Sequence, residues 1–231
     1  MSFKSTPKRV NKVLNNRIEQ MLKNDIDKKG CLPIVKMGDE VLRKKCPDYN
    51  ADLAPETLQK LIKTMKVTMR EAPGVGLAAP QIGLNLNLAV LEDRSAEAED
   101  FDPAEDDRET ALVEFFVAIN PRYEPIEDAD GLIHELLFYE GCLSFAEHYA
   151  ARYRFHKIRA FWTDEKGRDH EEVLTGWPAR IFQHETDHLH GEVYIDKAII
   201  RSLSTSNNLS ENAWDDDLQY TAKALGFDLE E

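Results

Sequence analysis

The chain has few cysteines, and their arrangement argues against disulfide bonds. Cys31, Cys46 and Cys142 are the only three among 231 residues, an odd number at unrelated spacings. A secreted domain held together by disulfides needs paired cysteines, so this class is excluded and reduced thiols are expected. We therefore expect a cytoplasmic protein, with an organellar matrix as the alternative.

Long apolar runs are also absent. No run approaches the roughly 20 residues that a membrane-spanning helix needs. The start, Met1 to Lys4, lacks the apolar core of a secretory signal. We expect no membrane partner. The hydrophobic fraction of 42% is enough to close the core of one domain with extensions.

The negative charge is concentrated rather than spread. The formal net charge is -14, and the segment from Glu92 to Glu109 holds ten acids against Arg94 and Arg108, a local net of eight negative charges. Such a composition is typical of a solvated loop between two strands. The alternative is a docking surface for a basic partner. Residues 92–110 are called the acidic insertion below.

The N-terminal segment is basic and amphipathic. Lys4, Lys8, Arg9, Lys12 and Arg17 all precede the first acid. Apolar side chains then recur at helical spacing, which predicts a helix over about residues 7–24. These side chains are Val10, Val13, Leu14, Ile18, Met21 and Leu22. The helix is expected to pack on the domain, and the alternatives are an organellar presequence and a ribosomal RNA contact.

The middle of the chain predicts an α+β fold. A helix is expected over residues 55–71, with Pro55 in its first turn. Short strands are expected at residues 32–35, 86–91, 112–119, 132–139 and 158–163, and a turn at 164–167 leads to a hairpin strand at 170–174. This pattern indicates antiparallel sheets with few helices. Residues 202–231 have the composition of a polar linker and an acidic tail, with a short helix near Trp214.

The segment from Gln183 to Gly191 contains an HExxH motif. His184 and His188 are four residues apart, so on a helix they share one face and can bind one metal ion, with Glu185 beside it as a proton carrier. By chance the motif also occurs on polar helices with surface histidines. Here Trp177 and Ile181 extend the same stripe, which places both histidines on the inward face.

A catalytic site of this kind normally has a third protein ligand. His190 is turned away from the metal face. Cys142 is favoured because it follows Gly141 at the end of a predicted strand, where the backbone permits a close approach. The alternative for Cys142 is a small core residue. The other candidates are His148, His156, His170 and Glu192.

Three segments in order identify a resemblance. They are Gly74 to Gly83 (GVGLAAPQIG), Glu140 to Ser144 (EGCLS) and Gln183 to Gly191 (QHETDHLHG). Together they resemble peptide deformylase, a metal-dependent hydrolase that removes the formyl group from the N-terminal methionine of new chains. The resemblance covers residues 32–196. It implies antiparallel sheets packed around a central metal-binding helix that carries HExxH.

The resemblance also implies roles for single residues. Cys142, His184 and His188 would hold one divalent metal ion, Fe²⁺ in the cell, with Zn²⁺, Ni²⁺ or Co²⁺ in purified protein. Glu185 would be the general acid and base. The Gln81 amide and the Leu143 N–H would stabilise the oxyanion.

The substrate would be a nascent N-formylmethionyl peptide, processed during protein biosynthesis. The backbone of Gly74, Val75 and Gly76 would pair with the extended peptide, and Gly141, also a substrate-binding residue, would free the backbone around Leu143. Val75, Trp177 and Ile181 would surround the methionine side chain. The glycine segment lacks the lysine of a phosphate loop. We expect no sequence-specific nucleic acid partner and a monomer, with a contact to the ribosome surface as an additional candidate.

Two further expectations concern the site's surroundings. An ion pair between Glu140 and Arg154 would hold the cysteine turn. Ala146 and Tyr149 depart from residues common in the family, which leaves the entrance and the peptide preference open. The domain organisation expected is an N-terminal extension (1–30), a catalytic domain (31–201) and a C-terminal segment (202–231).

Two alternative functions remain at this point. A protease of the zincin type would use HExxH with a downstream ligand such as Glu192. A structural metal site in a ribosome-associated protein would have four protein ligands and no open position.

Overall fold

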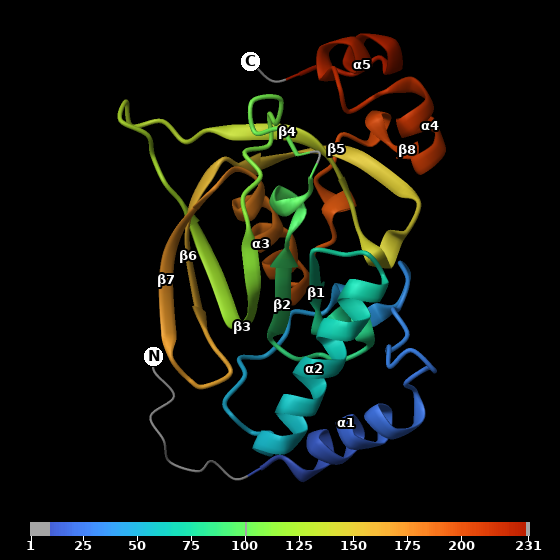
Figure 1. Cartoon of the computed structure of the whole chain (residues 1–231), viewed down its shortest axis with the longest axis vertical. Coiled ribbons are helices and arrows are strands. Elements are labelled where there is room, and N and C mark those ends of the chain that lie inside the picture. Colours follow the sequence, from blue (N-terminus) through green and yellow to red (C-terminus); the bar gives the residue numbers. More distant parts are fainter. Residues whose placement is uncertain (1–9, 100, 230–231) are drawn as a thin grey trace.

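The computed structural model describes residues 10–99 and 101–229. Two antiparallel sheets form its framework (Figure 1). The five-stranded sheet has the order β1-β2-β3-β6-β7 and the three-stranded sheet the order β4-β5-β8. The bounds are β1 Gly76–Ala78, β2 Leu88–Asp93, β3 Val113–Pro125, β4 Glu135–Gly141, β5 His148–Phe155, β6 Lys157–Thr163, β7 Asp169–Thr175 and β8 Ser204–Thr205. The α+β prediction with antiparallel sheets is confirmed.

Helix α3 (Gly176–Leu189) contacts strands of both sheets. It contains the HExxH motif, and Ile181 and His188 on its inward stripe are 3% and 1% exposed. Gly176 is the first residue of α3 and has a φ of 61°, a left-handed conformation that favours glycine. The remaining helices are α1 Lys12–Asn24, α2 Pro55–Glu71, α4 Ser206–Asn212 and α5 Leu218–Leu225. The short 3-10 helices are η1 Glu40–Arg43, η2 Ala79–Ile82, η3 Ser95–Glu97, η4 Leu143–Phe145, η5 Tyr194–Asp196 and η6 Ile200–Ser202.

Helices α1 and α2 pack together at one end of the molecule (Figure 1). Helix α2 has the predicted bounds, and its apolar stripe is buried in the core. Helix α1 begins at Lys12, where Asn11 caps it by accepting a hydrogen bond from the Leu14 N–H at 3.2 Å. Of the predicted stripe, Ile18 is fully buried but Val13 is 81% exposed. The first residues of the predicted helix, 7–9, lie outside the described part.

The strand expected at residues 32–35 does not form. Pro33 has no N–H to donate, and its neighbours bond to different parts of the molecule. The Leu32 N–H donates to the Thr68 hydroxyl at 3.0 Å, and the Val35 N–H donates to the Gln81 carbonyl at 2.9 Å. The other predicted strands are present, with β3 running six residues beyond Ile119. Strands β1, β5 and β8 are not among the predicted strands.

The composition of the C-terminal segment predicts a polar linker and one short helix near Trp214, and the structure has a strand and two helices there, with α5 over Leu218–Leu225. Ser202 is fully buried, and its hydroxyl accepts a hydrogen bond from the Ala151 N–H at 2.7 Å. Strand β8 pairs with β5, and helices α4 and α5 follow. Linker-like serines therefore serve here as hydrogen-bonding partners of a strand. The acidic insertion connects β2 to β3, with Glu92 and Asp93 still inside β2. None of the described helices is long and apolar enough to cross a membrane.

Candidate active site

Cys142, His184 and His188 come together at the end of β4 and on α3. Their ligand atoms all lie within 4.8 Å of one another. The Cys142 Sγ is 3.3 Å from the His188 Nε2, and the two Nε2 atoms are 3.1 Å apart. One turn of helix separates the two imidazoles, as the motif spacing predicted.

The atoms in this group suit a metal ion. Two Nε2 atoms at 3.1 Å can share at most one proton, so a common electrophilic partner would satisfy both lone pairs together with the sulfur. Burial lowers the pKa of His188, and so does the neighbouring His184, which favours a neutral imidazole that can act as a ligand. A thiolate with two imidazoles suits iron, nickel, cobalt or zinc.

The other candidates for the third ligand have other partners. Glu192 pairs with Arg152 at 2.5 Å and with Lys197 at 2.8 Å, so the ligand set of a zincin-type protease is not assembled. His156 bonds to Glu109, His170 to Asp164 and His148 to the Ala146 carbonyl, and His190 is exposed. Among the described residues, Cys142 is the one that joins the two histidines in such a group.

Glu140 orients His184 from behind. The Nδ1 atom of His184 is 2.6 Å from the Glu140 carboxylate, which leaves Nε2 facing the thiol. Arg154 forms a two-pronged pair with the same carboxylate at 2.9 and 2.6 Å, so the predicted Glu140 to Arg154 ion pair is confirmed. Burial alone would raise the pKa of Glu140, but Arg154 and His184 hold it well below its ordinary value.

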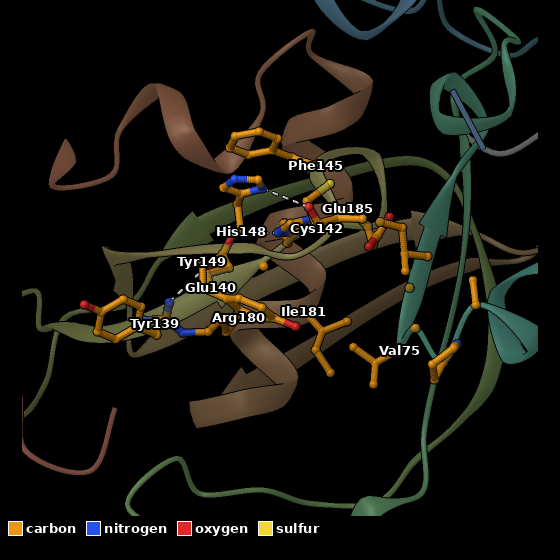
Figure 2. A pocket seen from close by; sticks show the side chains of 18 of the residues that line it. Val75, Tyr139, Glu140, Cys142, Phe145, His148, Tyr149, Arg180, Ile181 and Glu185 are labelled. Carbon is orange, nitrogen blue, oxygen red and sulfur yellow. Dashed lines mark hydrogen bonds and ion pairs between the residues drawn. The ribbon is translucent and has the colours of Figure 1, made fainter. Parts of the chain in front are cut away.

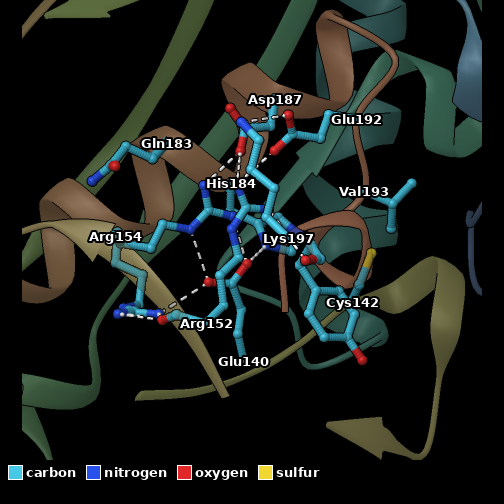
Figure 3. Close-up of polar contacts among 12 residues, drawn as sticks. Glu140, Cys142, Arg152, Arg154, Gln183, His184, Asp187, Glu192, Val193 and Lys197 are labelled. Atoms are coloured by element: carbon cyan, nitrogen blue, oxygen red, sulfur yellow. Dashed lines mark hydrogen bonds and ion pairs between the residues drawn. The ribbon is translucent and has the colours of Figure 1, made fainter. Parts of the chain in front are cut away.

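The ion pair belongs to a larger buried network that the sequence did not reveal (Figure 3). Asp187, the residue before the second motif histidine, accepts hydrogen bonds from Arg152 at 2.9 Å and Arg154 at 2.6 Å. The Tyr123 hydroxyl donates to it at 2.9 Å, and Arg180 pairs with Glu140 at 3.1 Å. One signal was available. Arg152 and Arg154 alternate along β5, which is how two side chains on one face of a strand are spaced.

Glu185 lies between α3 and β1 and is 4% exposed. Its Oε2 atom has no hydrogen-bond partner among the described residues. A Cβ added to Gly76 would stand 2.2 Å from the other carboxylate oxygen, so only glycine fits there. Burial raises the pKa of Glu185 to about 7, which is suitable for accepting and returning a proton near neutral pH.

Gln81 and Leu143 approach the thiol from two sides. The Gln81 amide oxygen accepts a hydrogen bond from the Ala78 N–H at 2.7 Å, which turns the amide nitrogen toward the Cys142 sulfur at 3.6 Å. Leu143 begins η4 directly after Cys142. A Cβ on Gly74 would stand 2.7 Å from the Leu143 side chain, so this glycine permits close packing of the two segments.

A cavity of 460 Å³ opens onto these groups. Figure 2 shows it from close by, with Val75 beside β1 and Ile181 on α3. All the substrate-contacting residues predicted from the sequence line it together with Cys142, His184 and Glu185, namely Gly74, Val75, Gly76, Gly141, Trp177 and Ile181. His188 lies beneath it, 1% exposed. Buried potential metal ligands and a carboxylate at the floor of a cleft are typical of a metal-dependent hydrolase.

Comparison with known proteins gives the family. The family model described as polypeptide deformylase matches residues 31–203. Peptide deformylase of Bifidobacterium adolescentis is 52% identical over 94% of this chain and 95% of its own length. Peptide deformylase 1 of Streptomyces coelicolor is 40% identical over 94% of both chains. The chain belongs to the peptide deformylase family.

A solved structure agrees in fold. A class I type b peptide deformylase from Acinetobacter baumannii with bound Met-Ala-Ser has a TM-score of 0.61 and 28% identity, and the match covers 72% of this chain and 98% of that chain. The protein is therefore an enzyme, a hydrolase of protein biosynthesis that uses a divalent metal ion and removes the formyl group from the N-formylmethionine of nascent peptides.

Proposed function

We propose that Cys142, His184 and His188 hold the metal ion of this deformylase and that α3 is the metal-binding helix between the sheets. The observation that supports this most directly is the convergence of one sulfur and two imidazole nitrogens within 4.8 Å, beside a buried carboxylate. Fe²⁺ is the ion proposed for the cell, and Zn²⁺, Ni²⁺ or Co²⁺ suit the same donor atoms.

A divalent ion bound there would polarise the formyl carbonyl and increase the acidity of water. Glu185 takes one proton from the attacking water as the water oxygen bonds to the formyl carbon. The Gln81 amide and the Leu143 N–H donate to the carbonyl oxygen as it gains negative charge. Glu185 then delivers the proton to the leaving nitrogen as the C–N bond breaks. Formate and a peptide with a free α-amine result.

The substrate lies along β1 in this proposal. Gly74, Val75 and Gly76 would offer backbone groups to the extended peptide, while Gly141 lines the same cavity, where the absence of a Cβ leaves room for the ring of Tyr149. Val75, Trp177 and Ile181 would enclose the methionine side chain. The Met-Ala-Ser bound to the Acinetobacter baumannii neighbour supports a cleft that accepts residues beyond methionine.

The broader organisation is also proposed. Residues 1–30 form an N-terminal extension, 31–201 the catalytic domain with the acidic insertion, and 202–231 a C-terminal segment. The enzyme acts as a monomer in the cytoplasm, without a membrane or sequence-specific nucleic acid partner. The basic N-terminal segment is the part proposed to contact the ribosome surface, because its charge is opposite to that of RNA.

The test is anaerobic purification with Fe²⁺, followed by measurement of formate released from formyl-Met-Ala-Ser. Glu185→Gln should lower kcat by about 10²- to 10⁴-fold while the metal content stays that of wild type. Glu171→Gln is the matched control, since its carboxylate is 55% exposed on β7. Metal-loaded protein without formate release, or full activity in Glu185→Gln, would contradict the proposal.

A further inference from the structure

The end of the acidic insertion meets the C-terminal segment over the cleft. Arg108 and Asp215 form an ion pair at 3.3 Å, and each side chain is 33% exposed. Both residues line the 460 Å³ cavity together with His184 and Glu185. Asp215 lies beyond residue 203, where the match to the family model ends. A pair of charged residues from two peripheral segments thus forms part of the wall of the catalytic cleft.

Arg108 is fixed in place by its own loop. The Asp106 carboxylate accepts a hydrogen bond from the Arg108 N–H at 3.2 Å. The Arg108 carbonyl lies against the start of α3, where a Cβ on Gly176 would stand 2.8 Å from it. The guanidinium lies 5.4 Å from the ring centre of Trp177 and 5.7 Å from that of Phe138. The side chain is therefore positioned at the cleft.

The guanidinium of Arg108 has N–H groups without a hydrogen-bond partner in the described part of the chain. A guanidinium carries five N–H groups, and in the described part of the chain the one side-chain hydrogen bond of Arg108 is the 3.3 Å contact with Asp215. Arg180, the other arginine of the cavity wall, is 4% exposed and donates to Glu140 and to the carbonyls of Leu136 and Arg152. Of the two arginines in this wall, Arg108 is thus the one that can donate hydrogen bonds to a ligand.

The cleft continues past Arg108 toward α4. A second cavity of 390 Å³ shares Tyr149, Leu209 and Asp215 with the catalytic cavity. An extended peptide advances about 3.3 Å per residue. A peptide whose formyl group reaches Glu185 would therefore need a path of this kind for the residues that follow methionine.

We propose that Arg108, held by Asp215, binds main-chain carbonyl oxygens of the peptide residues that follow formylmethionine. This inference rests on the proposed function of the cleft. Main-chain carbonyls fit better than acidic side chains because Asp215 and Asp216 line the same path and would repel a carboxylate. Recognition through the main chain also suits an enzyme whose substrates are nascent peptides.

The test compares a long and a short substrate. The tripeptide is formyl-Met-Ala-Ser with an amidated C-terminus, which has the downstream carbonyls without a terminal carboxylate, whereas N-formylmethionine methylamide ends at the methionine carbonyl. Arg108→Ala should raise KM for the tripeptide about tenfold at unchanged kcat, as the loss of a charge-assisted hydrogen bond predicts. KM for the methylamide should change less than about twofold. Arg94→Ala is the control, because Arg94 pairs with Glu97 within the same insertion.

Three results would overturn the inference. An equal rise in KM for both substrates would mean that Arg108 acts only through Trp177 and the methionine pocket. No rise for either would mean that it does not bind the peptide. A third substrate, formyl-Met-Glu-Ser with an amidated C-terminus, carries an acidic side chain, and a rise in KM confined to it would assign Arg108 to that side chain.

Arg108→Lys is a second test variant, which keeps the proposal testable if Arg108→Ala does not fold. Lysine keeps the positive charge but lacks the planar set of N–H donors of a guanidinium. KM should therefore rise less than in Arg108→Ala, and only for the tripeptide. A lysine variant equal to wild type on both substrates would contradict the proposed subsite. If wild-type protein releases no formate from either substrate, the proposed function itself is contradicted. If wild-type protein turns over both substrates and Arg108→Ala does so equally well, only the proposed role of Arg108 is contradicted.

Discussion

Glu140 connects the candidate metal ligand His184 to the buried ion-pair network. Its carboxylate is 5% exposed and contacts His184, Arg154 and Arg180. A buried carboxylate is costly unless it is paired, and here three cationic or hydrogen-bonding groups compensate it. The same contact fixes which nitrogen of His184 faces the thiol. Stability and ligand orientation are therefore coupled at one residue.

Arg154→Ala tests this coupling. It would leave Glu140 and Asp187 buried with fewer counter-charges, and breaking a buried ion pair costs about 3–5 kcal/mol of unfolding free energy. We expect that loss in urea unfolding, together with lower metal content and activity, because His184 loses its support. Arg159→Ala is the control, since Arg159 pairs with Glu171 on the exposed face of the sheet. A variant with full metal content and activity would rule out a role for Arg154 in holding the site.

At the scale of elements, α1 is joined to the domain by part of its stripe. Ile18 is fully buried in the main core cluster, whereas Val13, five residues earlier, is 81% exposed. Ile18→Ala should lower the unfolding free energy by about 2–5 kcal/mol, since it creates a cavity. Val13→Ala should change it by less than about 0.5 kcal/mol. Urea unfolding of both variants measures this difference, and equal small effects would show that α1 is not part of the cooperative core.

Elements with a regular apolar pattern are predictable from the sequence, whereas a strand that buries charged side chains is not. The stripe of α2 and the turn before β7 follow local rules of helix and hairpin formation. Strand β5 escaped prediction because Arg152 and Arg154, each 3% exposed, occupy inward positions where apolar residues are expected. Their counter-ions Glu140, Asp187 and Glu192 lie on β4, on α3 and just after α3. No local pattern contains that information.

The site shows the same division. The spacing of His184 and His188 is local, so it predicts that these two histidines come together, whereas Cys142 is singled out as the third potential ligand by the resemblance of three motifs to peptide deformylase. The pair between Arg108 and Asp215 joins segments 107 residues apart, and neither segment shows a motif. Its discovery required the fold.

On the scale of the whole molecule, the segments outside the family-model match at residues 31–203 lie at two ends of the catalytic part. Helix α1 packs on α2 at one end, while β8 forms an edge strand of the three-stranded sheet and α4 and α5 follow it at the other end (Figure 1). The Bifidobacterium adolescentis relative matches 94% of the chain, whereas the match to the Acinetobacter baumannii structure covers 72%. The peripheral segments are thus shared with some relatives, and one of them reaches the cleft through Asp215.

Metal binding should stabilise the whole fold, because the three proposed ligands join the end of β4 to α3. Binding to the folded state alone adds about 4 kcal/mol when free metal exceeds its Kd a thousandfold. For a chain of this size that corresponds to a rise in Tm of about 8–16 °C. Chelation of the anaerobic protein should lower Tm by that order, and Fe²⁺, Zn²⁺, Ni²⁺ or Co²⁺ should restore it.

Two cysteine variants identify the source of the shift. Cys142→Ser removes the proposed thiolate, so its Tm should respond little to chelation or to added metal. Cys31→Ser should respond as wild type does, since Cys31 lies outside the group of three. Activity measured alongside Tm for each ion separates metals that only stabilise the fold from those that support formate release. A wild-type Tm that chelation leaves unchanged, in protein shown to be metal-free afterwards, would mean that the three side chains do not link β4 to α3 through an ion.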